Sequence, residues 1–230
     1  MKEYNPIKSW SKEFLNKRDL AYPSEYLIRI FKGKYPKLKL SGSKMDGMKI
    51  CDVGCGDGRN LILLNDCGFK IFGTEISEEI VQNVKNKMND LNIDCNIQVG
   101  INNKNPFTDK FFDFLVSWNS CYYMGNNLSF ESHVKEFYRV LKPEGFLILS
   151  IPMKSCFIFS KSEEIQKGYQ VIKHDPFNVR NGEVLRMFFD EKEIEKEFSK
   201  YFTNFIFGTI KDDCFGLNYH WHLIICQKKK

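Results

Sequence analysis

Residues 49–64, KICDVGCGDGRNLILL, decide the fold. The stretch begins with an apolar strand over residues 50–53 and passes through a turn with glycine at 54, 56 and 58. A helix then opens near Arg59 and carries the apolar side chains of residues 61–64. Because glycine lacks a Cβ, such a turn can adopt positive φ and let a ligand approach the backbone closely. Strand, glycine turn and helix in this order predict a nucleotide-binding βα unit whose helix start attracts an anionic group.

The spacing of these glycines separates two kinds of nucleotide site. The dinucleotide fingerprint is G-x-G-x-x-G, and its third glycine would stand where this chain has Arg59, which would crowd a diphosphate. Glu75 ends the next predicted strand, 19 residues after Gly56, where a carboxylate can accept hydrogen bonds from two ribose hydroxyls. The pattern therefore predicts a nucleoside with a free ribose and no diphosphate. A structural tight turn with an exposed Glu75 is the alternative.

Strands and helices alternate along the rest of the chain. Strands are predicted over residues 50–53, 69–74, 95–99, 111–117 and 146–151, with amphipathic helices between them. A helix over residues 190–200 and two strands, 201–210 and 218–227, follow. The fold class is therefore α/β: a Rossmann-like, doubly wound, mostly parallel sheet in three αβα layers, closed by an antiparallel hairpin. Ligands of such folds bind beyond the carboxyl ends of the strands.

Two segments stand outside this alternation. Residues 1–44 precede the first strand and are predicted to form an N-terminal helical lid or appendage on a single domain over residues 45–230. Residues 152–183 show no clear period and are predicted to be an irregular insertion on the acceptor side. A stretch of that length inside a compact domain is usually functional or mobile.

Three stretches resemble one known family. DVGCGDGRN at residues 52–60, PFTDKFFDFLVSWN at 106–119 and EFYRVLKPEGFLILSIP at 136–152 are similar to signatures of the class I S-adenosylmethionine-dependent methyltransferases. The resemblance covers residues 48–152 and, more loosely, the closing hairpin. It implies S-adenosyl-L-methionine as cofactor and methyl transfer as the reaction. The family chooses its acceptor outside these motifs, so the acceptor stays open.

The resemblance also implies where the cofactor binds. Asp52 and the glycine-turn backbone are expected at its amino acid end, and Glu75 at its ribose. The acid common in the adenine-side loop of the family is replaced, because Ile101 follows Gly100, so the amide of Asn102 is expected there instead. The expected cofactor-binding residues in the domain are Asp52, Gly54, Cys55, Gly56, Asn60, Glu75, Ile76, Ile101, Asn102, Trp118 and Asn119.

Aromatic residues of the N-terminal segment are further candidates for cofactor contact. In the resembled family such a segment often folds over the cofactor, and Trp10 and Tyr22 are predicted to take part, with Tyr26 as a third candidate. The alternative is that these rings only pack the appendage onto the domain.

Methyl transfer mainly requires that acceptor and methyl group be aligned, and a base is needed only where the acceptor must lose a proton. His174 in the insertion is the best-placed base, and Tyr123 is the second catalytic candidate. His133 is predicted to be exposed on its helix. His220 and His222 are predicted to face one side of a strand and to make structural hydrogen bonds, with metal binding as the alternative.

Two segments at the carboxyl ends of strands are predicted to hold the acceptor. Residues 118–124 and 154–180 mix aromatic rings with polar groups, and the cations Lys154 and Arg180 could hold a phosphate. The alternative is that the rings fill the core and the cations are solvated. A pocket under the hairpin at Tyr219 and His220 is the other place considered.

The composition limits the remaining classes. The chain of 230 residues has a net charge of +5, but its lysines are scattered, so a nucleic-acid partner is not expected. Eight cysteines show neither a C-x-x-C pair nor zinc spacing, which favours reduced thiols and no metal. The first twenty residues are polar and no apolar run reaches membrane length, so we expect a cytoplasmic protein without membrane contact.

The sequence thus predicts methyl transfer to a small polar acceptor such as a sugar, a nucleotide-sugar or a similar metabolite. A nucleic-acid or protein methyltransferase is one alternative, although no recognition domain or basic stripe is visible. A catalytically silent cofactor-binding module is another, although no glycine-loop or ribose residue is lost. A dinucleotide oxidoreductase is disfavoured by Arg59. The oligomeric state is left open.

Overall fold

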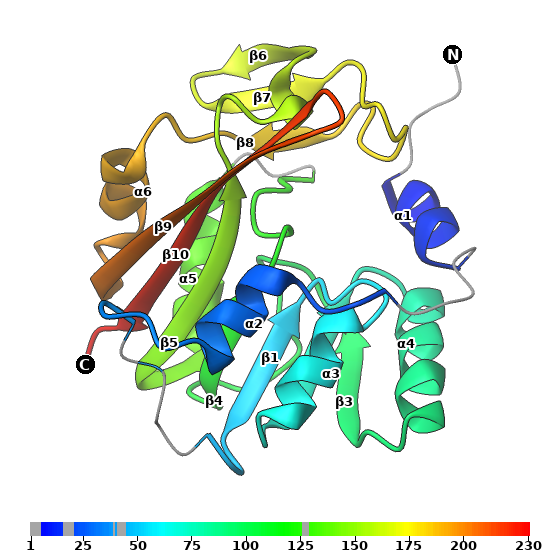
Figure 1. The fold of residues 1–230 in the computed structure, drawn as a ribbon, viewed down its shortest axis with the longest axis vertical. Coiled ribbons are helices and arrows are strands. Elements are labelled where there is room, and N and C mark those ends of the chain that lie inside the picture. The colour runs from blue at the N-terminus through cyan, green and yellow to red at the C-terminus, as the bar shows by residue number, and fades with distance from the viewer. Residues whose placement is uncertain (1–5, 16–20, 39, 41–44, 126–128) are drawn as a thin grey trace.

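A seven-stranded sheet forms the centre of the molecule (Figure 1). The structure is a computed structural model that describes the chain except residues 1–5, 16–20, 39, 41–44 and 126–128. The strand order is β3-β2-β1-β4-β5-β10-β9, and β10 runs antiparallel to both neighbours while the other pairs are parallel. The strands are β1 (Lys49–Val53), β2 (Lys70–Glu75), β3 (Cys95–Val99), β4 (Phe112–Ser117), β5 (Leu141–Pro152), β9 (Phe202–Cys214) and β10 (Leu217–Lys228).

Helices cover both faces of this sheet because alternate strand residues are apolar on both sides. Ile50 packs with the helices of one face, and Cys51 belongs to the cluster on the other. The first face carries α2 (Glu25–Lys32), α3 (Arg59–Asp66) and α4 (Glu78–Asp90), and the second carries α5 (Phe130–Val140) and α6 (Glu191–Phe198). The predicted three-layer, doubly wound fold with a closing hairpin is confirmed.

The insertion after β5 is more ordered than the sequence indicates. It contains η1 (Phe157–Phe159) and an antiparallel sheet of β6 (Ser162–Gln166), β7 (Tyr169–Ile172) and β8 (Val184–Arg186). The expectation of an irregular segment was wrong, because these strands are too short and β6 too exposed to show a period. Backbone hydrogen bonds from Arg186 N to Tyr122 O and from Met124 N to Val184 O attach this small sheet to the end of β4.

The N-terminal segment contains two helices with different surroundings. The second helix, α2, buries Leu27, Ile30 and Phe31 against the sheet and belongs to the packed core. The first, α1 (Pro6–Leu15), lies beyond the carboxyl ends of the strands, beside the start of α4 (Figure 1). Only α1 is therefore in a place where it could cover a ligand.

His133 corrects one prediction. Its side chain is 2% exposed, and its Nδ1 lies 2.9 Å from the carbonyl oxygen of Cys121. The buried face of α5 includes positions 130, 133, 134, 137 and 140, so it is one residue wider than the apolar residues alone suggest. Burial lowers the pKa of His133 to about 4, and the ring is neutral and structural.

The described residues lack two kinds of feature. No helix among them is long and apolar enough to span a membrane. No group of three or more His, Cys, Asp or Glu side chains in the described part of the chain is arranged to hold a metal ion.

Candidate functional site

The glycine turn forms a cradle at the carboxyl ends of β1 and β2. Gly54 has φ of +73°, and a Cβ there would stand 2.7 Å from the Ser120 side chain. Gly56 also has positive φ, at +63°. The N–H groups of Gly54 and Cys55 donate to Thr74 O at 2.9 and 3.1 Å, which fixes the turn against β2. Glycine is required here because its neighbours leave no room for a side chain and its backbone needs the left-handed region.

Glu75 closes one side of the cradle. One carboxylate oxygen accepts from Gly56 N at 2.6 Å and the other from Ile76 N at 2.9 Å. The residue is 4% exposed, so the expected position beside the glycine turn is correct and the alternative of an exposed Glu75 is wrong. Burial raises the pKa of Glu75 to about 7, although the N–H groups of Ile76 and Gly56 oppose this shift.

Asp52 lies beneath the turn and is incompletely hydrogen-bonded. It is 1% exposed, and only its Oδ2 approaches a donor, Nδ2 of Asn60 at 3.5 Å. Its Oδ1 has no hydrogen-bond partner among the described residues. Burial raises the pKa of Asp52 to about 7, the amide of Asn60 opposes this, and the charge of Glu75 adds to it. A buried carboxylate without full pairing costs stability, and it is typical of a site that a ligand completes.

The neighbouring loop leaves a second acceptor atom open. Asn102 donates from Nδ2 to Ser120 O at 2.9 Å, while its Oδ1 is buried without a partner in the described part of the chain. Two carboxylates and an amide oxygen at one edge suit a cationic nucleoside with free hydroxyl and amino donors. S-adenosylmethionine, with its sulfonium, ammonium and ribose, fits this donor demand, and Asp52, Glu75 and Asn102 are the residues that would hold it.

The other predicted cofactor residues have different surroundings. Asn60 also accepts from Ser24 N at 3.1 Å and so ties the chain before α2 to the first turn of α3. Cys55 is buried under the turn. Ile76 gives its N–H to Glu75, and Ile101 is an exposed residue bridged to Lys104.

The first helix lies across the cradle. The Phe14 ring is 3.1 Å from where a Cβ of Gly56 would stand, and Phe14 O accepts from Asn83 Nδ2 at 3.4 Å. Trp10 stacks on Phe14 at 5.5 Å and meets Tyr123 edge-on at 5.6 Å. The structure thus brings Trp10 to the site. Tyr22 is 92% exposed and is not brought to it.

Arg180 connects α1 to the insertion. It donates from Nε to the Tyr123 hydroxyl at 2.9 Å and pairs with the fully buried Asp175 at 3.1 Å, and its guanidinium lies 5.7 Å from the Trp10 ring centre. Burial raises the pKa of Tyr123 to about 12 although Arg180 opposes it, so this hydroxyl stays protonated at neutral pH. The His174 side chain is exposed, and its backbone N–H donates to Lys161 O. The Tyr123 hydroxyl accepts from Arg180, and no hydrogen bond joins it to the His174 side chain in the described part of the chain.

A constrained turn follows β4. Asn119 has φ of +58°, and its N–H donates to Ser150 Oγ at 2.8 Å. Ser150 Oγ in turn donates to Asn119 Oδ1 at 2.7 Å, so the ends of β4 and β5 hold each other. A left-handed, non-glycine residue fixed by its neighbours is a frequent feature of functional sites.

An aromatic cavity of about 340 Å³ opens beside this turn. We call it the aromatic cavity; its lining comes from the start of α2, the ends of β4 and β5, and the hairpin β9–β10: Ser24, Tyr26, Trp118, Asn119, Ser150, Ile210, Asp212, Cys214, Tyr219 and Trp221. Sequence reasoning placed Trp118 and Asn119 here and considered Tyr219. It missed Tyr26 as an acceptor-side wall, as well as Asp212 and Trp221, because only the strand register brings them together.

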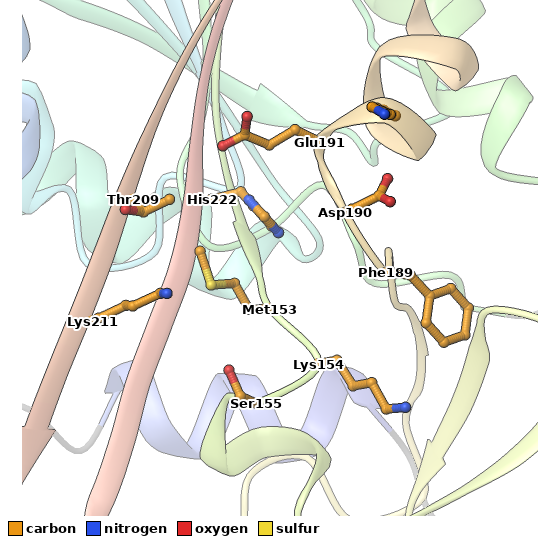
Figure 2. Close-up of a pocket in the computed structure, with 10 residues that line it drawn as sticks. Met153, Lys154, Ser155, Phe189, Asp190, Glu191, Thr209, Lys211 and His222 are labelled. Carbon is orange, nitrogen blue, oxygen red and sulfur yellow. The ribbon is translucent and has the colours of Figure 1, made fainter.

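A second cavity, the lysine cavity, has a volume of about 730 Å³, and Figure 2 shows residues that line it. Its lining residues on β9 and β10 alternate with those of the aromatic cavity, so it lies on the opposite face of the same hairpin. His222 points from β10 toward the segment carrying Asp190, and Lys211 projects from β9. His222 is 7% exposed, and its Nδ1 has no partner among the described residues. The residues that line it are Met153, Lys154, Ser155, Phe189, Asp190, Glu191, Lys192, Thr209, Lys211 and His222.

The two cations predicted to hold a phosphate, Lys154 and Arg180, do not line a common cavity among the described residues. Lys154 lines the lysine cavity, whereas Arg180 lines neither cavity within the described chain. His220 donates to or accepts from Ser155 Oγ at 2.8 Å, so the predicted structural hydrogen bond is present for His220.

Comparisons with known proteins agree with this geometry. A family model described as a methyltransferase domain matches residues 50–145. An uncharacterized protein of Methanocaldococcus jannaschii, MJ1252, is 25% identical over 203 residues, which is 82% of this chain and 74% of that protein. The ubiquinone/menaquinone biosynthesis C-methyltransferase UbiE of Rickettsia prowazekii is 31% identical over 126 residues, 54% of this chain but only 44% of the relative.

Solved structures share the fold. A SAM-dependent methyltransferase from Methanosarcina mazei superposes with a TM-score of 0.64 at 20% identity, covering 85% of this chain and 98% of that one. At 20% identity this similarity shows a shared fold only.

Proposed function

We propose that the chain is a class I S-adenosylmethionine-dependent methyltransferase, and that it transfers the cofactor's methyl group to a small polar acceptor beside the ends of β4 and β5. The observation that carries this proposal is the incompletely paired Asp52 next to Glu75 and the Asn119–Ser150 turn. When bound, S-adenosylmethionine supplies a methyl group already activated on a sulfonium. The protein's task is therefore alignment and exclusion of water.

Each part of the ligand edge has its own task in this proposal. Glu75 accepts from the ribose hydroxyls, and Asp52 accepts from donors at the amino acid end. The Asn119–Ser150 turn fixes the end of β4, where the aromatic cavity meets the cofactor edge. We assign the covering role to α1, whose Phe14 and Trp10 reach from the glycine turn to Tyr123.

The cysteines and the aromatic cavity bear on location and partners. All eight cysteines are free, which favours a reducing compartment such as the cytoplasm. The acceptor is a small molecule in our proposal, because the aromatic cavity has a volume of only about 340 Å³. A nucleic-acid partner is not proposed.

Calorimetry tests the cofactor assignment. S-adenosylmethionine and S-adenosylhomocysteine should bind with micromolar or tighter dissociation constants, and NAD should not. NAD binding without a signal from S-adenosylmethionine would contradict the assignment. Binding of S-adenosylhomocysteine without methylated product from any acceptor would favour the silent module.

Substitutions at Tyr123 and His174 test the catalytic candidates. If either residue takes part in catalysis, Tyr123→Phe or His174→Ala should lower turnover more than tenfold while cofactor affinity stays within about threefold. Full activity in both variants would remove them from the mechanism and leave the aromatic cavity as the acceptor site. Lys161→Ala, an exposed change in the same insertion, is the matched control.

A further inference from the structure

The walls of the aromatic cavity are unusual in their chemistry. Four of its ten lining residues are large rings, Tyr26, Trp118, Tyr219 and Trp221, and one is the carboxylate Asp212. No lysine, arginine or histidine is among these ten residues. The face of an aromatic ring is negative, so ring faces and a carboxylate together attract a cation.

Three of the four rings have contacts that hold them in place. Trp221 packs on the buried Tyr122 with ring centres 5.9 Å apart, and Tyr219 packs on Phe157 at 4.9 Å. Tyr26 donates its hydroxyl to Asp212 Oδ2 at 3.0 Å, which joins α2 to the hairpin across the cavity. Walls that are already positioned lose little entropy when a ligand binds.

The cations near the aromatic cavity do not line it. Arg29 lies 5.7 Å from the centre of the Tyr26 ring but is paired with Glu25 and is not among the lining residues. Lys211 of β9 pairs with His220 of β10, and it lines the lysine cavity on the other face of the hairpin. Arg180 is occupied by Tyr123 and Asp175. Within the described chain, the aromatic cavity therefore offers nothing cationic to a phosphate, and its volume of about 340 Å³ is at the lower end for small-molecule sites.

Resting on the proposed function, we propose that the methyl acceptor is a small amine whose nitrogen is received by Trp118, Trp221, Tyr219 and Asp212 in the aromatic cavity. The neutral amine attacks with its lone pair; the N–C bond forms as the C–S bond breaks, and the electron pair of that bond stays on sulfur. The positive charge thereby moves from sulfur to nitrogen. A secondary amine then releases one proton to water, whereas a tertiary amine has none to release.

This charge movement explains why rings and a carboxylate would surround the nitrogen. They interact more strongly with the nitrogen in the transition state than with the neutral amine, which is the condition for lowering the barrier. A sugar hydroxyl as acceptor would instead become oxonium-like and need a base beside it. Asp212 is the one carboxylate among the ten lining residues, and it already accepts from the Tyr26 hydroxyl at 3.0 Å.

The test is a matched pair of probes added to the protein saturated with S-adenosylhomocysteine. The probes are choline, a quaternary ammonium ion, and 3,3-dimethyl-1-butanol, which has carbon in place of nitrogen. Calorimetry and tryptophan fluorescence should show choline binding about tenfold or more tightly than the neutral isostere. Asp212→Asn should remove most of that preference, and Trp221→Phe should reduce it.

Asp213→Asn is the control, since it makes the same charge change on the adjacent, exposed residue of β9. Equal affinity for the two probes while S-adenosylhomocysteine is bound would overturn this inference alone. Failure of S-adenosylhomocysteine itself to bind would overturn the proposed function, and the acceptor role with it. An equal loss of choline preference in Asp212→Asn and Asp213→Asn would reduce the effect to general surface charge and contradict the proposed site.

Discussion

The cofactor cradle and the acceptor side bury charge in opposite ways. In the cradle, Asp52 and Glu75 are buried with no cation paired to either carboxylate among the described residues, and the pKa of each is raised to about 7. On the acceptor side, the fully buried Asp175 is paired with Arg180 and accepts two backbone N–H groups. The insertion thus supplies the partners of its own buried charge, whereas we propose that a ligand supplies the missing partners in the cradle.

This difference separates groups that serve binding from groups that serve structure. A buried charge that the protein leaves unpaired destabilises the ligand-free state and is compensated when a ligand supplies the missing donors. A buried charge that is already paired stabilises the fold only as long as both partners remain. The predictions below test this assignment from the largest expected effect to the smallest.

Removal of Arg180 should leave a buried charge on the acceptor side without its partner. Arg180→Ala leaves Asp175 buried without its cation, and we expect a loss of about 3–5 kcal/mol in the free energy of unfolding. Urea denaturation with and without the substitution measures it. Lys173→Ala breaks the exposed Lys173–Glu163 pair of the same small sheet and should leave the midpoint unchanged. Equal effects of the two substitutions would show that burial of Asp175 is not what matters.

Removal of Glu75 should instead damage binding. Glu75→Ala takes away a charged acceptor at the cradle, so we expect cofactor affinity to fall by about 1.5–3 kcal/mol. Calorimetric titration with S-adenosylhomocysteine measures the loss. Glu78→Ala, an exposed acidic residue in the first turn of α4, is the control. An unchanged dissociation constant in Glu75→Ala would remove this residue from the site.

The two carboxyl groups of the cradle predict opposite pH dependences for stability and for binding. A folded-state pKa of about 7 lies above the unfolded value near 4, so the ligand-free protein gains stability as the pH falls through 7 and loses it as the pH rises. Each group contributes up to about 1.4 kcal/mol per pH unit in that window. Cofactor affinity should instead fall as the pH falls through 7, because protonation of the two carboxylates removes the acceptors that the ligand needs.

Melting temperatures of the ligand-free protein and calorimetry with S-adenosylhomocysteine, both at pH 5.5 and 8.0, measure the two trends. The Glu75→Gln variant should show a shallower dependence in both, because one titrating group is gone. Parallel trends in stability and affinity would contradict the assignment of these carboxyl groups to the ligand.

The same contrast explains what the sequence could and could not predict. The cradle is built from residues 52–75, a continuous stretch, so the glycine spacing and Glu75 are visible as a local pattern. The aromatic cavity joins Tyr26, Trp118, Asp212 and Trp221, which meet only through the register of β10 with β5 and β9. The small sheet at β6–β8 was invisible because its strands are too short for a period. The exposed position predicted for His133 was wrong, because a polar residue can complete a buried helix face when a backbone carbonyl accepts a hydrogen bond from its ring N–H.

The smallest effect we predict concerns α1, which touches both regions. Phe14 contacts the glycine turn and stacks on Trp10, which in turn meets Tyr123 and Arg180. Because one aromatic contact is worth about 0.5–1.5 kcal/mol, Phe14→Ala should weaken cofactor binding roughly threefold if α1 covers the bound ligand. The exposed Tyr22→Ala is the matched control.

The sign of the Phe14→Ala effect decides between two roles for α1. A helix that closes over the cofactor loses contacts in the variant, so affinity falls, and S-adenosylhomocysteine should protect the wild-type chain from protease cleavage between Trp10 and Tyr35. A helix that only fills the ligand-free cradle competes with the cofactor, so its weakening would raise affinity and cleavage would increase on binding. Tighter binding in Phe14→Ala than in Tyr22→Ala would therefore exclude the covering role and make α1 a plug that the cofactor must displace.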